Sequence, residues 1–139
     1  MKIVNYRLCS DDGTPYPFIP SPNTEGRVQP KFLVIHYTGG PSAASAVAWL
    51  TSKTSQVSAH LVIDRNGAIT QLVPFNIVAW HAGRSTWKGY SNLNFSSLGI
   101  ELDYPGPLSC IKTVWTSTFG TQFTDQGILE AMPRYGNKL

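Results

Sequence analysis

Proline and glycine divide this chain into short segments, which favours a fold of brief strands and loops over one of long helices. Its 139 residues include 12 glycines and 10 prolines. Five of the prolines lie between Asp11 and Pro30, where they exclude a helix and a strand in the centre of a sheet. We therefore interpret residues 1–30 as a Pro/Gly-rich arm on the surface of a single domain that spans residues 1–139.

Two short apolar runs after the arm have the composition of buried strands. The first, Phe32 to Tyr37, has a β-branched centre and lies between Pro30 and Gly39. The second, Ser97 to Leu102, is equally compact and contains Glu101 near its end. Both runs are expected to be strands of one sheet.

A helix and a hairpin are expected between these two strands. Ser42 can cap a helix that starts near Ala43 and reaches about Lys53. The runs 58–63 and 68–73 flank an Asn-Gly pair, which tolerates positive φ and favours a tight hairpin turn. The expected fold class is α/β: a central mixed sheet built from the Phe32, Ser58, Ala68 and Ser97 strands, with the helix packed on one face.

Charge and hydropathy narrow the range of partners. The formal net charge is +3, but the eleven Lys and Arg residues are scattered, so a nucleic-acid-binding domain ranks last among the interpretations. No apolar window approaches the roughly 20 residues of a membrane span, and no membrane insertion is expected. The first residues show no signal-peptide pattern, so the expected location is cytoplasmic as synthesised, with any action outside the cell only after release or export.

The three histidines lie in unlike local settings. His36 ends a buried strand, His60 lies inside a hairpin strand, and His81 lies in an aromatic loop. On local grounds a strand histidine is more often a hydrogen-bonded structural residue than a metal ligand. Likewise, Glu101 alone is as typical of an ordinary strand-end carboxylate as of a catalytic one.

Four blocks of sequence change those odds. They read FLVIHYTGG at residues 32–40, VSAHLVI at 57–63, AWHAG at 79–83 and LGIEL at 98–102. In this order they resemble the zinc-dependent N-acetylmuramoyl-L-alanine amidases, the family that includes phage endolysins and peptidoglycan recognition proteins. With the proline-rich arm, the resemblance covers residues 1 to about 106.

The resemblance implies an amidase that cleaves the bond between N-acetylmuramic acid and the L-alanine of the peptidoglycan stem peptide. Zinc would polarise the carbonyl and activate water, with His36 as a metal ligand and Glu101 as the base. The apolar run around Glu101 should raise its pKa toward neutrality. The partner would be peptidoglycan or a soluble muropeptide.

The loop that contains the AWHAG block, residues 79–90, suggests substrate contacts. His81, Trp80, Trp87 and Arg84 combine aromatic surface for sugar rings with a cation for peptide carboxylates. The alternative is an aromatic mini-core beneath a long loop. His60 and His81 do not match zinc ligands of the family.

The resemblance weakens toward the end of the sequence. In the family, a second histidine and an Asp or Cys complete the zinc site after a long helix, whereas no histidine follows His81 here. Residues 122–132 resemble the start of that helix, but Pro133 interrupts it, and Cys110 and Asp125 stand in no matching motif. We therefore expect an incomplete, truncated amidase domain with one of three zinc ligands, weak zinc affinity and little hydrolysis. The main rival is a non-catalytic peptidoglycan-binding module.

Overall fold

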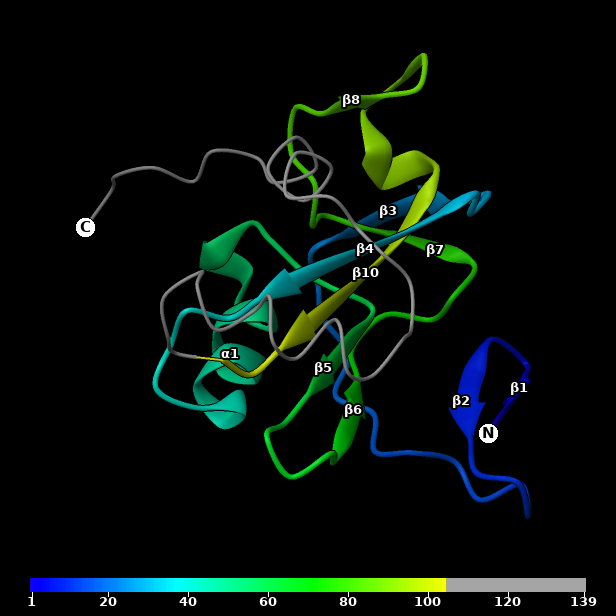
Figure 1. Ribbon diagram of the computed structural model, residues 1–139, viewed down its shortest axis with the longest axis vertical. Helices are drawn as coiled ribbons and strands as arrows, with labels where there is room; N and C mark the ends of the chain where they lie inside the picture. Colours follow the sequence, from blue (N-terminus) through cyan, green and yellow to red (C-terminus); the bar gives the residue numbers. More distant parts are fainter. Residues whose placement is uncertain (105–139) are drawn as a thin grey trace, which may run out of the picture.

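A computed structural model describes residues 1–104. Its largest sheet has four strands in the order β4 (Phe32–Tyr37), β10 (Ser97–Leu102), β5 (Leu61–Ile63) and β6 (Ile69–Gln71) (Figure 1). The bounds predicted for β4 and β10 are confirmed. The helical start predicted for residues 122–132, and the residues Cys110 and Asp125, lie outside the described residues.

The last of the described strands, β10, occupies an interior position in this sheet. β10 pairs in parallel with β4 on one side and with β5 on the other, whereas β5 and β6 are antiparallel. The predicted mixed sheet is therefore confirmed. Because β4 and β10 are parallel, their carboxyl ends meet at one edge of the sheet, and this edge carries the predicted site residues.

One α-helix is found among residues 1–104, and it starts where the sequence predicts. Helix α1 (Ala43–Leu50) begins with a reciprocal capping box, in which the Ser42 side chain accepts from the Ser45 amide and the Ser45 hydroxyl accepts from the Ser42 amide. It ends at Leu50 instead of near Lys53, and a 3₁₀ turn (Lys53–Ser55) follows. Among the described residues, no helix has the length and apolar character needed to cross a membrane.

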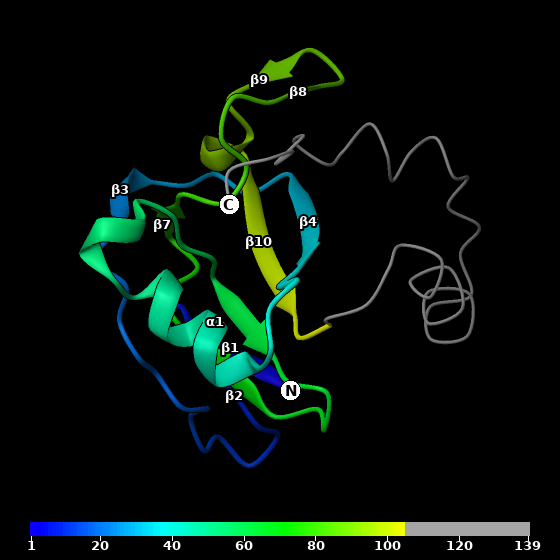
Figure 2. The same cartoon turned by 90° about the vertical axis from the view of Figure 1, so that its left-hand side faces the viewer.

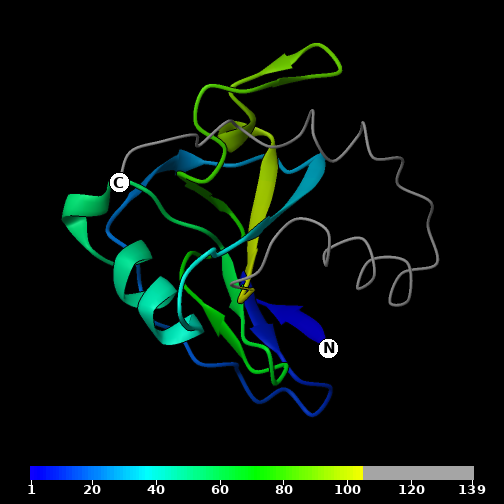
Figure 3. The same cartoon turned by 60° about the vertical axis from the view of Figure 1, so that its left-hand side comes forward.

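The helix lies along one face of the sheet (Figures 2 and 3). Ala43 and Leu50 of α1 pack with Val62 of β5 and Leu72 in the main hydrophobic cluster. Val62 is the register partner of Glu101 on β10, and paired residues on neighbouring strands point to the same face. Glu101 therefore faces the same side of the sheet as the helix.

The predicted hairpin forms with shorter strands than expected. Its strands are Leu61–Ile63 and Ile69–Gln71, and Gly67 in the turn has a φ of +84°. The Asp64 amide donates to the Ala68 carbonyl at 2.9 Å and closes the turn. The positive φ explains why glycine is favoured at this position.

The N-terminal arm is mostly exposed and forms three short strands. It contains β1 (Lys2–Val4), β2 (Arg7–Cys9) and β3 (Thr24–Arg27), and β3 pairs with β7 (Ile77–Ala79) outside the main sheet. None of the three arm strands lies in the centre of a sheet, as the prolines of the arm predict. What the proline count missed is that residues 24–27 contain no proline, so an edge pairing was still open to them.

A buried glutamine of β6, Gln71, fastens the β1–β2 hairpin to the main sheet. The Gln71 Oε1 atom accepts from the Leu8 amide at 2.9 Å and from Arg7 Nε at 3.0 Å. Its Nε2 atom donates to the carbonyl of Tyr6 at 3.1 Å. Because Gln71 is fully buried, these bonds satisfy a side chain that would otherwise be costly to bury.

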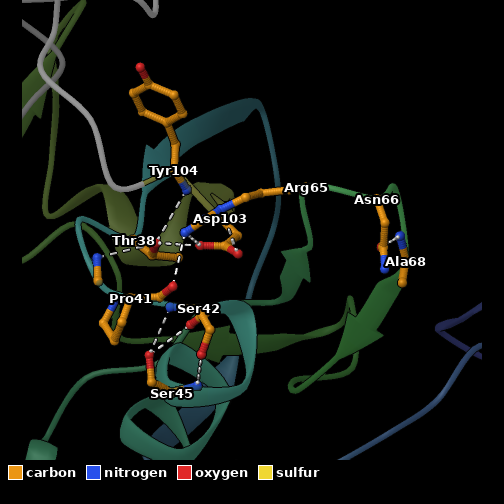
Figure 4. Close-up of polar contacts among 10 residues, drawn as sticks. Thr38, Pro41, Ser42, Ser45, Arg65, Asn66, Ala68, Asp103 and Tyr104 are labelled. Carbon is orange, nitrogen blue, oxygen red and sulfur yellow. Dashed lines mark hydrogen bonds and ion pairs between the residues drawn. The ribbon is translucent and has the colours of Figure 1, made fainter.

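An ion pair joins the segments that meet at the carboxyl edge of the sheet (Figure 4). Arg65, from the hairpin turn, places its Nε 3.2 Å from Asp103 Oδ2 and donates to the Pro41 carbonyl at 3.0 Å. Thr38 Oγ1 donates to Asp103 Oδ1 at 3.3 Å. The Asp103 side chain is 3% exposed, so these partners offset the cost of burying its carboxylate. This clamp holds the ends of β4 and β10 against the start of α1.

Removal of the arginine from this clamp should destabilise the chain. We expect Arg65→Ala to lower the free energy of unfolding by about 1–3 kcal/mol, because the buried Asp103 carboxylate loses its cation. Arg65→Lys, which keeps the charge but not the forked geometry, should lose less. Urea denaturation of both variants, with the exposed Arg27→Ala as control, measures the effect. Equal stability of Arg65→Ala and the control would contradict the clamp.

Candidate active site

The two predicted chemical residues lie side by side on neighbouring parallel strands. His36 and Glu101 are register partners on β4 and β10. Paired residues on adjacent strands are about 4.8 Å apart and point to the same face. Each is the fifth of six residues in its strand, so both lie at the carboxyl edge of the sheet. The structure thus brings them together as the sequence predicted, while their chemical roles stay predictions.

A glycine makes room for a third side chain on this face. Gly99 precedes Glu101 by two residues on β10 and therefore presents the same face of the strand. A Cβ atom at Gly99 would lie 2.4 Å from Cγ and 2.7 Å from Nδ1 of His81. The His81 imidazole consequently packs directly on the backbone of β10, in space that any other residue would fill.

His81 connects the loop before β8 to the strand that carries His36. Its Nδ1 lies 3.0 Å from His36 Nε2, and the two rings meet edge to face at 69°. Its Nε2 lies 3.2 Å from Ser97 Oγ. The ring is 6% exposed, and both of its nitrogens have partners within the protein. The predicted contact between His81 and substrate stays a prediction.

Two polar residues that the sequence analysis did not single out hold His81 in place. Asn94 Oδ1 accepts from the amides of His81 at 3.0 Å and Ala82 at 2.7 Å. Ser97 contacts the ring from the first position of β10. No sequence signal marks either residue, because their partners are backbone amides and a ring nitrogen that are distant along the chain.

His60 is a scaffold residue, in agreement with its sequence interpretation. It is fully buried, with Nδ1 accepting from the Gly99 amide at 3.0 Å and Nε2 lying 3.0 Å from the Ile77 carbonyl. Its ring lies 5.9 Å from that of His81, centroid to centroid. Because the carbonyl can only accept, Nε2 carries the proton and Nδ1 is the acceptor. Both nitrogens are therefore occupied.

Burial keeps all three imidazoles neutral at ordinary pH. Desolvation lowers the pKa of His36 to about 4 and that of His60 to about 4. For His81, burial and then the neighbouring His36 and His60 lower the pKa to about 3. A neutral imidazole keeps a lone pair on one nitrogen, which is the form that binds metal ions.

Burial acts in the opposite sense on the carboxyl group. Desolvation raises the pKa of Glu101 to about 7, and its Oε2 is buried without a hydrogen-bond partner among the described residues. A base with a pKa near the working pH combines availability of the deprotonated form with strength as a proton acceptor. The expected rise toward neutrality is thus found, and its cause is the burial of the carboxyl group.

The residues predicted to contact substrate are spread over a neighbouring region. Arg84 is exposed and lines an open pocket of about 580 Å³. Trp87 lies on β8 (Thr86–Trp87), which pairs with β9 (Tyr90–Ser91), and Trp80 is half-buried with its Nε1 lacking a partner in the described part. The pocket is lined by residues of the loops around this hairpin: Gly83, Arg84, Ser85, Thr86, Ser91, Asn92 and Asn94.

This pocket lies before β10, while His36 and Glu101 lie at the other end of the strand. The lining residues lie before or within the 3₁₀ turn Leu93–Phe95 that leads into β10, and neither His36 nor Glu101 lines the pocket. Asn94 connects the two regions, because it lines the pocket and also accepts from the His81 amide. The arrangement suits an extended ligand that runs along β10, with polar groups at one end and the reacting bond at the other.

The described residues fit a metal ion only in part. His36 uses Nε2 toward His81, so its Nδ1 is the ring nitrogen left for a ligand. A catalytic zinc site needs three protein ligands, and residues 1–104 contain no cluster of three His, Cys, Asp or Glu side chains that could hold a metal. A full ligand set is therefore not found in this part of the chain, and the role of His36 as a ligand stays a prediction.

Comparison with known proteins identifies the family of this chain. Residues 26–131 match the sequence profile of the N-acetylmuramoyl-L-alanine amidases. The match covers more than half of the chain, so the protein belongs to the N-acetylmuramoyl-L-alanine amidase family.

Individual relatives agree with the family. The amidase AmiD of Escherichia coli K12 is 47% identical over an 83-residue alignment that covers 55% of this chain and 29% of AmiD. The 1,6-anhydro-N-acetylmuramyl-L-alanine amidase AmpD of Salmonella typhimurium SL1344 is 33% identical over a 105-residue alignment that covers 61% of this chain and 56% of AmpD. This chain therefore spans only about a third to about half of these relatives' lengths.

Solved structures show the same fold. A selenomethionine derivative of AmpD superposes with a TM-score of 0.60 at 31% identity, covering 75% of this chain and 66% of AmpD. Escherichia coli AmiD, in complex with the substrate anhydro-N-acetylmuramic acid-L-Ala-D-gamma-Glu-L-Lys, gives a TM-score of 0.50 at 43% identity over 62% of this chain and 33% of AmiD. The fold class predicted from the sequence, an amidase-type α/β fold, is confirmed.

A methyl group at the glycine beneath His81 should disturb the site. We expect Gly99→Ala to lower the free energy of unfolding by about 1–3 kcal/mol, because the new Cβ overlaps the imidazole and the strand backbone cannot yield easily. The His36 to His81 hydrogen bond should be lost as the ring moves. Thermal unfolding measures the first effect, and the ring resonances of His81 report the second. Gly40→Ala is a control for general loss of glycine, since its φ is not positive and a Cβ built there would meet only ordinary contacts, 3.6 Å from Ser45 Oγ and 3.9 Å from the Thr38 carbonyl oxygen. Unchanged His81 resonances in Gly99→Ala would contradict the close packing.

Replacement of the buried carboxyl should stabilise the protein in a pH-dependent way. Since folding raises the pKa of Glu101 to about 7, its contribution to stability is lost as the pH rises from the unfolded value through about 7. We expect Glu101→Gln to raise the free energy of unfolding by roughly 1–3 kcal/mol near pH 8 and by much less near pH 5.

Urea denaturation at the two pH values gives the comparison. The histidines act in the opposite sense: their pKa values fall on folding, so their stabilisation is complete above the unfolded pKa and is lost as the pH falls through about 4. This loss is common to the wild type and Glu101→Gln and cancels in their difference. A stability gain independent of pH would show that Glu101 is not desolvated.

Proposed function

We propose that this chain acts on muropeptides, hydrolysing the amide bond between N-acetylmuramic acid and the L-alanine of the stem peptide. The observation that carries the proposal is the pairing of His36 with Glu101 on β4 and β10, on one face and at one edge of the sheet. The names of the relatives, which are amidases of this bond, support the choice of substrate. The AmiD complex with an anhydromuramyl tripeptide supports a muropeptide partner.

In the proposed reaction Glu101 is the base. Its unpartnered Oε2 takes a proton from the attacking water, and the same carboxyl can return a proton to the departing amine of L-alanine. A pKa of about 7 suits both steps, since the group changes protonation state near neutral pH. His36 would hold zinc through Nδ1, and bound zinc would polarise the scissile carbonyl and lower the pKa of the water.

The neighbouring pocket would receive the rest of the substrate. Arg84 offers a guanidinium to the carboxylates of the stem peptide, and Ser85, Asn92 and Asn94 offer polar groups beside it. Trp80 and Trp87 provide aromatic surface nearby for the sugar ring. These contacts explain why an extended ligand would run along β10.

Activity should be slow and should depend on Glu101. We expect the zinc-loaded chain to release free stem peptide from an anhydromuramyl tripeptide, with a rate limited by weak zinc affinity, because residues 1–104 supply a single fitting ligand. Glu101→Gln should lower kcat about 100-fold or more by removing the base, with little change in substrate affinity. Mass spectrometry of the released peptide measures the rate, and Ser96→Ala serves as a control. Hydrolysis that survives Glu101→Gln undiminished would refute the assignment.

A peptidoglycan-binding module without catalysis is the second candidate. It is favoured by the same observation, a single fitting metal ligand in the described part. Sedimentation with purified cell walls separates the candidates: retention on the walls with no peptide release at any zinc concentration favours the module, whereas release favours the enzyme. An Arg84→Ala variant should bind the walls less tightly in either case.

A further inference from the structure

A chain of hydrogen bonds runs from the main chain to the candidate metal ligand. Ser97 Oγ lies 2.6 Å from the carbonyl oxygen of Leu93, which can only accept. A hydroxyl has one proton, so toward His81 Nε2, at 3.2 Å, Ser97 Oγ can only accept. The Ser97 carbonyl, 3.5 Å from the same nitrogen, is also an acceptor. His81 therefore carries its proton on Nε2.

This assignment determines the protonation of the next ring. A neutral imidazole carries one proton, so His81 Nδ1 is an acceptor. Its partner at 3.0 Å is His36 Nε2, which must then be the donor. With its proton on Nε2, His36 has a lone pair on Nδ1. Among residues 1–104 this nitrogen has no hydrogen-bond partner.

We propose that His81 and Ser97 are positioning residues that hold His36 in the Nε2-protonated tautomer and leave Nδ1 bare on the side of the sheet that carries Glu101. Neither residue touches the reacting atoms in this role. Buried neighbours that bond the second nitrogen of a ligating histidine commonly fix its tautomer and orientation. We call the hydrogen bonds that run from Ser97 through His81 to His36 the relay. The purpose of the relay rests on the proposed function, whereas the tautomer itself is a property of the metal-free chain.

The packing explains why the relay is rigid. Gly99 lets the His81 ring lie against β10, where a Cβ would come within 2.8 Å of three of its atoms. Asn94 fixes the backbone of His81 through the amides of His81 and Ala82. The ring is therefore held from its backbone, from the strand beneath it and from both nitrogens. Transfer of the His36 proton from Nε2 to Nδ1 would set two lone pairs against each other and leave His81 Nδ1 without a donor in a buried place.

His81→Asn and His81→Leu differ in whether they leave a hydrogen-bond acceptor for His36. Asn and Leu have similar size, but in Asn the Oδ1 atom can accept a hydrogen bond close to the position of His81 Nδ1, whereas Leu offers no acceptor. Both remove the imidazole, so loss of packing is common to them. At Ser97, substitution by Ala removes the hydroxyl of the relay. Ser96→Ala is its matched control, because the neighbouring Ser96 Oγ is buried without a hydrogen-bond partner in the described part of the chain.

The test is nitrogen-15 NMR of the metal-free, full 139-residue chain, in which long-range proton–nitrogen correlations report which ring nitrogen carries the proton. We expect Nε2-protonated His36 and His81 in the wild type, with a scalar coupling across the hydrogen bond between His36 Nε2 and His81 Nδ1. His81→Asn and Ser96→Ala should preserve the His36 tautomer. His81→Leu should give a mixture of tautomers, and Ser97→Ala should weaken the coupling.

Two results would overturn the proposal: a wild-type His36 protonated on Nδ1, or a His36 tautomer that is the same in His81→Leu as in His81→Asn. Calorimetric zinc titration is a separate readout. We expect zinc affinity about 10- to 100-fold lower in His81→Leu than in His81→Asn, the usual effect of losing an outer partner of a ligand. A wild type that binds no zinc would refute the metal site of the proposed function while the NMR result still decides the relay.

Discussion

The insertion of β10 between β4 and β5 is the constraint on which the rest of the structure depends. This strand comes last among the described elements, yet it pairs with both earlier strands and closes the sheet between them. Parallel pairing of β10 with β4 sets Glu101 beside His36, and parallel pairing with β5 sets Glu101 beside Val62 and the hydrophobic cluster under α1. One strand thus completes the core and assembles the site.

The sequence predicts the individual strands and the helix better than it predicts which strands pair with one another. The bounds of the Phe32 and Ser97 strands and the Ser42 cap could be predicted, because apolar runs, β-branched residues and capping residues act locally. The pairing of β3 with β7 could not, because the short segment Thr24–Arg27 has no apolar pattern and gains its partner only in the folded chain. Family resemblance, not local pattern, selected His36 and Glu101 from among ordinary strand residues.

The relations between side chains were beyond the sequence for a physical reason. His81 was singled out for its aromatic loop. Its contact with His36 exists because its ring packs over Gly99, which lies 18 residues further along the chain. Asn94 and Ser97 are common polar residues whose importance comes from what they touch. Hydrogen bonds of this kind link residues through the fold and leave no periodicity in the sequence.

The chemistry of the site and the stability of the sheet oppose each other at Glu101. A carboxyl with a buried, unpartnered oxygen is costly in a strand, yet the same desolvation gives it a pKa of about 7, which a proton acceptor at neutral pH requires. The imidazoles resolve the same conflict differently, since hydrogen bonds satisfy both nitrogens of His60 and His81 and one of His36. Within the described residues, Glu101 Oε2 is therefore the buried polar atom at this edge that is left without a partner.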